Sequence, residues 1–321
     1  MGITAARLAP VILLLVLLGP RAAEGQGRDA QAARTLNGHR FVLSSRIDDP
    51  FITTMVRTQT GGGFATKVAR DVESEVLDSL VSSLVGDLAF MGLGFEFQYA
   101  PTAWLALSTS ASGLARLGTG AESVLAQGVT SGFGFEFRAA ARILQRERWI
   151  LSGTLRAEPS TQYRLDILTF AKRAIEEGKI AEDNSVVIRS EAVGMALGLR
   201  GAYAPRAWLG FILGGEAGYS DTFQETEGRN VVWRLGGQAS FDLDPLTGIP
   251  LGFLATAQED GFVLNASDLA KRTRALGFGV AYTGREDFSL SLEVSRMRVP
   301  LIQSDSTINA ASIDFNIRYF F

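Results

Sequence analysis

The sequence lacks cysteine altogether and contains a single histidine, His39, among its 321 residues. Without cysteine there are no disulfide bonds, no thiolate metal sites and no lipid-modified N-terminal cysteine. One histidine makes a transition-metal site improbable, and the acidic pairs Asp48-Asp49 and Glu259-Asp260 lack the spacing of a calcium-binding loop. We therefore expect no metal and no cofactor.

An excess of one charge sign is also missing. The formal net charge is -3, and basic residues interleaved with aromatic residues are not gathered in any loop. Nucleic-acid binding normally requires a basic face or stripe, so no nucleic-acid partner is expected.

A long apolar run is missing as well. The run from Val11 to Leu18 is shorter than the about 20 residues that a helix needs to cross a bilayer. Arg7 precedes this run and Gly19-Pro20 ends it, a pattern typical of a secretory signal, and we assign residues 1–25 to a signal peptide. An exported chain without a membrane helix crosses a membrane only as a closed barrel.

What the chain does contain is alternation of large apolar residues with small or charged ones. Phe288, Leu290, Leu292 and Val294 interleave with Ser289, Ser291, Glu293 and Ser295. Side chains on a strand alternate between its two faces, so one face is apolar and the other polar. The pattern predicts strands over residues 51–59, 90–99, 103–112, 130–140, 148–157, 190–203, 207–220, 231–243, 251–258, 273–283, 288–296 and 309–321.

Short and long links alternate between these strands. Pro101 and Pro205 lie in short turns with Tyr and Trp on either side, where an aromatic girdle at a membrane surface would place them. Short links at one end and longer ones at the other predict antiparallel hairpins with both termini on one side. We expect a periplasmic lead-in over residues 26–50 and a barrel over residues 51–321.

The last strand ends the chain on Tyr319, Phe320 and Phe321, after Ile313, Phe315 and Ile317 on one face. It resembles the closing strand of Gram-negative outer-membrane β-barrels. The resemblance implies an all-β, antiparallel transmembrane barrel of about twelve strands in the bacterial outer membrane, surrounded by its lipid. It also implies that Tyr319 and Phe321 serve as an assembly signal for the barrel-assembly machinery.

Two long links have helical spacing of apolar residues, over 67–85 and 165–180. These segments predict short helices in the extracellular loops. Such helices would either cap the strand ends or fold into the barrel mouth and narrow it.

Charged residues on the polar face are expected to point inward, since a charge on the lipid face is costly. Inward Gly, Ala and Ser would leave room for water or a small solute. The charges would either line an aqueous path or pair across the lumen of a closed, structural barrel. The predicted lumen-lining residues are Glu96, Glu136, Arg138, Arg156, Arg200, Glu216, Arg234, Asp242, Glu293, Asp314 and Arg318.

A barrel of about twelve strands lies between small, filled barrels and open channels. We expect a channel or transporter for small solutes. The alternative is a structural or surface-interaction barrel without transport. A lipid-modifying enzyme is less favoured, because His39 precedes the first strand and no second histidine can act as a base; we predict that the protein is not an enzyme.

Overall fold

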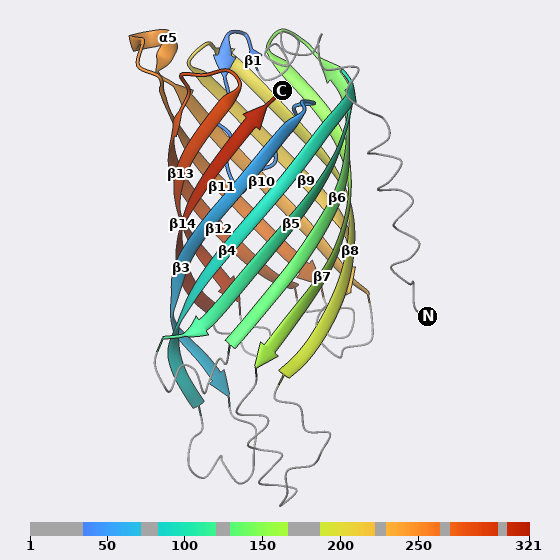
Figure 1. The fold of residues 1–321 in the computed structure, drawn as a ribbon, viewed down its shortest axis with the longest axis vertical. Helices are drawn as coiled ribbons and strands as arrows, with labels where there is room; N and C mark the ends of the chain where they lie inside the picture. Colours follow the sequence, from blue (N-terminus) through green and yellow to red (C-terminus); the bar gives the residue numbers. More distant parts are fainter. Residues whose placement is uncertain are drawn as a thin grey trace, which may run out of the picture.

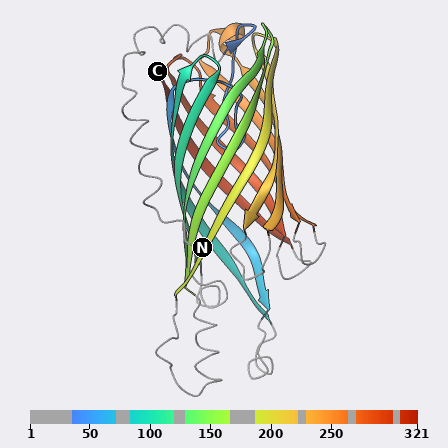
Figure 2. The same ribbon diagram turned by 90° about the vertical axis from the view of Figure 1, so that its right-hand side faces the viewer.

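The structure, a computed structural model, describes residues 35–71, 83–119, 129–165, 187–221, 229–263, 270–300 and 307–321. Twelve long strands form one closed antiparallel barrel (Figure 1, Figure 2). β14 pairs with β3 and thereby closes the cylinder. In chain order the strands are β3 (Met55–Asp71), β4 (Ser83–Thr102), β5 (Leu105–Gly118), β6 (Val129–Gln145), β7 (Trp149–Leu165), β8 (Val187–Arg206), β9 (Leu209–Asp221), β10 (Arg229–Asp242), β11 (Leu251–Val263), β12 (Ala270–Tyr282), β13 (Phe288–Pro300) and β14 (Thr307–Phe320).

The two ends of the barrel differ in their links. At the turn end, strands are joined by residues 103–104, 146–148, 207–208, 243–250 and 283–287, and the C-terminus lies there too (Figure 1). We call the opposite end, where the links lie outside the described residues, the loop end. Helix α5 (Asp244–Thr247) occupies one turn-end link. Among the described residues, no helix is long and apolar enough to cross a bilayer.

The closed antiparallel barrel confirms the predicted fold class, and all twelve predicted strands are present. Most strands extend further toward the loop end than predicted. There the hydrogen bonds between strands continue through polar residues, although apolar and polar residues no longer alternate clearly. The predicted helix over 67–85 is wrong at both ends, where β3 runs to Asp71 and pairs with the start of β4. Residues 72–82, 166–180 and the predicted signal peptide, 1–25, lie outside the described residues.

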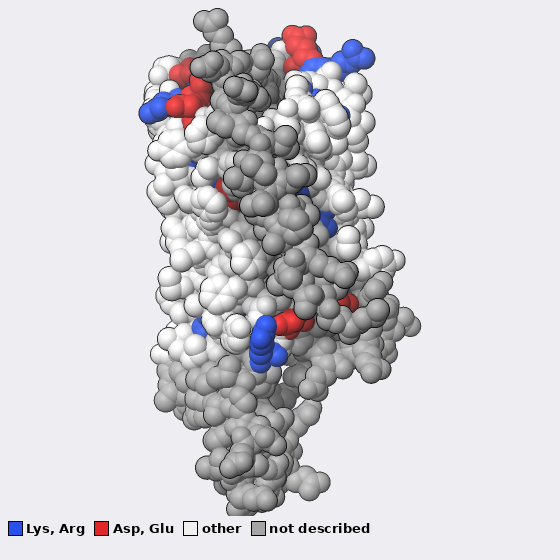
Figure 3. All heavy atoms as spheres, turned by 45° about the vertical axis from the view of Figure 1, so that its right-hand side comes forward, with Lys and Arg blue, Asp and Glu red and all other residues white. Residues whose placement is uncertain are grey.

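The outer face of the wall is apolar. The large apolar side chains of Leu292 and Ile313 point outward and are 46% and 57% exposed. On the face drawn in Figure 3, charged side chains gather toward the two ends, and the wall between them is largely uncharged. At the turn end the rings of Phe288 and Tyr319 contact each other, with centroids 4.9 Å apart. An apolar belt edged by aromatic rings is typical of a barrel that faces lipid.

A further segment lies inside the wall. Strands β1 (Thr35–Leu36) and β2 (His39–Arg40) pair at the turn end, and residues 41–54 then enter the lumen and return to the turn end, where β3 begins (Figure 1). We call residues 35–54 the plug. The plug overlaps residues 35–50 of the expected periplasmic lead-in and residues 51–54 of the first predicted strand, and its side chains have partners on the inner wall.

Candidate functional site

The plug begins with a hairpin fixed to the turn end. Asn37 and Gly38 form its turn with φ angles of 50° and 77°, the left-handed conformation that an Asn-Gly pair adopts readily. The side-chain amide of Asn37 donates to the carbonyls of Ala204 and Pro205, both at 3.2 Å, and its backbone N–H donates to the carbonyl of Glu147 at 2.9 Å. These bonds direct the following residues into the lumen.

His39 follows the turn and is fully buried. Its Nδ1–H donates to the carbonyl of Ala207 at 3.1 Å, so its Nε2 accepts from the hydroxyl of Ser240, also at 3.1 Å. Burial lowers the pKa of His39 to about 4, although the hydrogen bond to Ala207 favours the protonated form. The neutral ring is therefore used to hold the plug against the wall.

The apolar side chains of the plug form a core inside the barrel. Fully burying one side chain of this kind stabilises the packed state by about 1.5–3 kcal/mol. This part of the lumen is a packed protein interior, unlike the aqueous path that the inward charges could have lined. The largest cluster contains Leu36, Phe41, Leu43, Ile47 and Phe51 of the plug together with Met55, Ile150, Ala202, Ala204, Ile212 and Phe320 from the wall.

Inward glycines of the wall make room for these side chains. A Cβ atom at Gly236 would lie 2.6 Å from Cδ1 of Ile47, and one at Gly252 would lie 2.3 Å from Cγ2 of Val42. Space that was expected to hold water or a solute is taken here by the plug.

Wall side chains also satisfy the backbone of the plug. Gln238 accepts from the N–H of Ser44 at 3.1 Å and donates to the carbonyl of Val42. Glu293 accepts from the hydroxyl of Ser44 at 2.9 Å and from the N–H of Ser45 at 2.6 Å. A buried backbone group without a partner costs about 1–3 kcal/mol, so these inward residues compensate for the lack of a neighbouring strand.

The limb of the plug that returns to the turn end is held in the same way. Ser152 donates to the carbonyl of Pro50 at 2.7 Å, and Gln98 donates to the carbonyl of Thr53 at 2.8 Å. Both donors come from wall strands and are buried.

Three charges in the middle of the plug pair with charges of the wall. Arg46 lies 2.9 Å from Asp314 and also donates to Ser312 at 2.7 Å. Asp49 accepts from Arg318 at 3.0 Å. The third charge, Asp48, is described next.

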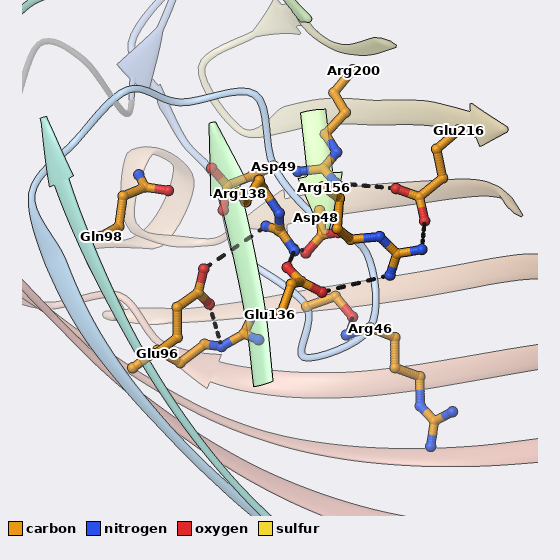
Figure 4. A network of polar contacts seen from close by, with 12 residues as sticks. Arg46, Asp48, Asp49, Glu96, Gln98, Glu136, Arg138, Arg156, Arg200 and Glu216 are labelled. Carbon is orange, nitrogen blue, oxygen red and sulfur yellow. Dashed lines mark hydrogen bonds and ion pairs between the residues drawn. The ribbon is translucent and has the colours of Figure 1, made fainter. Parts of the chain in front are cut away.

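Asp48 lies between Arg138, at 3.2 Å, and Arg200, at 2.8 Å, and joins the plug to a ladder of charges around the lumen (Figure 4). The ladder alternates in sign, with N···O distances of 2.7 to 3.8 Å apart from the closer Arg138–Glu136 pair. It runs through Arg57, Glu96, Arg138, Glu136, Arg156, Glu216, Arg234 and Asp260.

All eleven predicted lumen residues lie on the inner side of the wall. Glu96, Glu136, Arg138, Arg156, Arg200, Glu216 and Arg234 belong to the ladder or its link to Asp48, while Glu293, Asp314 and Arg318 contact the plug directly. Asp242 accepts from Thr283 at 3.0 Å near the turn end. That these residues line a passage for solutes stays a prediction.

The sequence pattern did not place Arg57 and Asp260 among the inward charges, and it did not indicate that residues 35–54 enter the lumen. The pair Asn37-Gly38 is a strong hairpin signal that could have revealed structure before the first wall strand. The acidic pair Asp48-Asp49, which lacks the spacing of a calcium-binding loop, forms ion pairs with arginines of the wall. Within the described residues, no group of three or more potential ligands could hold a metal ion.

Open space inside the wall lies toward the loop end. A cavity of about 440 Å³ is bordered by Arg46 of the plug and by Thr130 and Gln162 of the wall. A second, of about 230 Å³, adjoins Glu158. Beside Asp48 the cavity is about 30 Å³, a volume near that of one water molecule.

No protein-family model and no curated protein matches the chain. Solved structures do match. An outer membrane channel from Pseudomonas putida F1 is 13% identical with a TM-score of 0.53, and the match covers 87% of this chain and 100% of the channel. The fold is that of a Gram-negative outer-membrane β-barrel.

Two autotransporter barrels are also similar to this barrel in fold. The β domain of the Bordetella autotransporter BrkA is 14% identical with a TM-score of 0.49, over 84% of this chain and 100% of that domain. The translocator domain of NalP from Neisseria meningitidis is 12% identical with a TM-score of 0.47, over 94% and 96% of the two chains. At these identities the likeness concerns the fold.

Proposed function

We propose that the protein is a gated channel or transporter for small polar solutes in the bacterial outer membrane, and that the plug is its gate. The observation that carries the proposal is the separation of wall and plug. Each of the twelve wall strands is hydrogen-bonded to two other wall strands, and the plug supplies no strand to the barrel. The wall is therefore complete without the plug, and withdrawal of the plug would open the lumen.

The contacts of the plug support a reversible gate. Arg46, Asp48 and Asp49 are held by ion pairs, and a charged solute that reaches the plug can compete for their partners. The 440 Å³ cavity ends on Arg46, so a solute entering from the loop end would meet a charge that holds the plug in place. The fold shared with the Pseudomonas putida channel agrees with this proposal.

Conductance of the protein in planar bilayers tests the gate. The full-length barrel should show infrequent openings that become more frequent with applied voltage. A variant lacking residues 35–50 should conduct continuously, because the wall remains closed on itself. The matched control is Arg189→Gln, which removes an exposed outer arginine and should leave conductance unchanged.

The second candidate is a structural or surface-interaction barrel, which the packed core between plug and wall favours. In that case the full-length protein stays silent at every voltage while the shortened variant conducts. This outcome would contradict the channel proposal and leave the plug as a permanent filling.

We also propose that Tyr319 and Phe321 act in assembly. Both side chains point outward at the end of the chain, 48% and 58% exposed, where another protein can contact them. Phe321→Ala should lower the fraction of folded barrel in the membrane without changing the stability of the folded barrel. Equal folded fractions in the variant and the unaltered protein would argue against this role.

A further inference from the structure

The outer wall carries a cluster of four arginines near the loop end. Arg272 and Arg274 belong to β12 and Arg296 and Arg298 to β13, and all four are exposed. The register places Arg274 opposite Arg298. Toward the turn end, the next outward positions on these strands are apolar, so the cluster lies at the loop-side edge of the lipid-facing belt. These apolar residues are Leu276, Phe278, Leu292 and Val294.

The cluster is not neutralised by the described residues around it. Among the described residues, Glu259 is the one carboxylate that forms ion pairs with the cluster, 2.7 Å from Arg274 and 3.5 Å from Arg272. Arg298 donates to the hydroxyl of Thr307 at 3.2 Å, which adds no negative charge. Like charges placed opposite each other on a sheet repel, and an anion bound between these arginines would relieve that repulsion.

An apolar groove begins beside this cluster. It has a volume of about 1150 Å³ and reaches from Glu259 and Arg274 across the outer wall to Tyr203 near the turn end. Its floor consists of small outward residues on neighbouring strands, with large apolar side chains around them. The floor includes Gly215, Gly237 and Ala257, and the rim includes Leu199, Leu213, Leu235 and Leu276.

We infer that this surface binds a phosphate-bearing lipid of the loop-side leaflet, with its phosphate on the arginines and an acyl chain in the groove. Guanidinium groups match phosphate oxygens in geometry and charge. A soluble anion would leave the groove empty, and an uncharged lipid would leave the arginines unpaired. The inference needs only that the barrel spans a membrane and holds whether or not it conducts.

Lipid binding to the delipidated barrel in detergent micelles tests the inference, with bound lipids counted by native mass spectrometry. The unaltered protein should bind phosphatidylglycerol at least tenfold more tightly than phosphatidylcholine. A basic residue at an anionic membrane surface contributes about 1 kcal/mol, about fivefold in affinity. The triple variant Arg274→Gln, Arg296→Gln, Arg298→Gln should therefore bind phosphatidylglycerol about a hundredfold more weakly.

The controls separate the two parts of the site. Ala257→Leu fills the groove and should weaken the binding of both phosphatidylglycerol and phosphatidylcholine, while the arginines stay in place. Arg189→Gln, on β8, should leave the affinity for both lipids unchanged, since Arg189 is paired with Glu191. Folding of each variant is checked by the heat-dependent shift in gel mobility of the barrel.

Three results would overturn the inference. The triple variant would bind phosphatidylglycerol as tightly as the unaltered protein, or Ala257→Leu would bind both lipids normally. Inorganic phosphate at millimolar concentration would displace phosphatidylglycerol, which would identify a site for free anions instead of a lipid site.

Discussion

Arginine holds the interior of the barrel together because its planar side chain can contact two carboxylates at once. Arg156 lies 2.7 Å from Glu216 and 3.5 Å from Glu136, and so joins two rungs of the ladder. Arg138 similarly contacts both Glu96 and Asp48. Removing one partner of a buried pair costs about 3–5 kcal/mol, because the other charge is left uncompensated. Of these two arginines, Arg138 also ties the plug to the wall, through Asp48.

His39 should make the hold on the plug dependent on pH. Its pKa is about 4 when buried and 6.5 when exposed, so the withdrawn plug binds more protons between these values. The free energy that holds the plug in the lumen is therefore largest above about pH 6.5 and decreases as the pH falls toward 4. At pH 5 the loss is about 2 kcal/mol, or about 30-fold, measurable by hydrogen exchange of residues 35–44 after correction for the intrinsic rate.

The control for this prediction is His39→Gln, which keeps a donor and an acceptor but does not titrate. Exchange in this variant should vary much less between pH 7 and pH 5. An equal dependence on pH in both proteins would assign the effect to other groups.

Two adjacent glycines offer a sharper test of the gate. Gly236 faces Ile47 of the plug, which is 5% exposed and packed in the core, so a new side chain there has no free space to enter. Gly237 faces the outer wall, where a Cβ would meet the end of Leu213 at 2.9 Å, a side chain that is 67% exposed and free to move. Gly236→Val should displace the plug and raise the open probability at least tenfold in bilayer recordings. Gly237→Val should leave it within twofold, and similar openings in both variants would count against the proposed gate.

At the scale of the element, β13 shows how one strand serves two environments. Leu292 points to the lipid side and is 46% exposed, while the next residue, Glu293, is 2% exposed and binds the plug. Leu292→Arg should impair membrane assembly, since an arginine on the lipid face at mid-depth costs about 2–4 kcal/mol. The folded fraction in urea titrations with lipid vesicles measures this effect.

Glu293→Arg is the companion variant on the inner face. It should assemble normally, but it removes the acceptor for Ser44 and Ser45 and should loosen the plug. Recordings should then show more openings and an altered preference between anions and cations. Equal assembly of the two variants at positions 292 and 293 would contradict the assignment of the faces.

At the scale of the whole molecule, the plug and the wall interact as two parts joined at Met55. A barrel lacking residues 35–50 should therefore be blocked by a synthetic peptide covering residues 35–50 added at the turn end. A peptide with Asp48→Asn and Asp49→Asn should block at least tenfold less well, because it loses its pairs with Arg200 and Arg318. Block from the loop end at equal concentration would contradict the direction of entry.

Much of the fold could be predicted from the sequence, because alternation follows directly from the lipid on one side of the strand and polar groups on the other. The residues from Phe288 to Ser295 are a clear example. The loop-side ends of β3 and β4 could not be predicted, since apolar spacing there also fits a helix and only strand pairing decides between the two. The inward charges were assigned to the correct face, but their partners were not.

The sequence alone determined a closed barrel with an apolar exterior, since a chain with that alternation and no membrane helix has no other way to satisfy its backbone in lipid. Only the tertiary structure decided what fills the interior. Residues 41–54 do not alternate as a membrane strand does, and their partners lie as far away in sequence as Glu293 and Arg318. Contacts at such separations form only when the cylinder closes around the segment, so no local pattern specifies them.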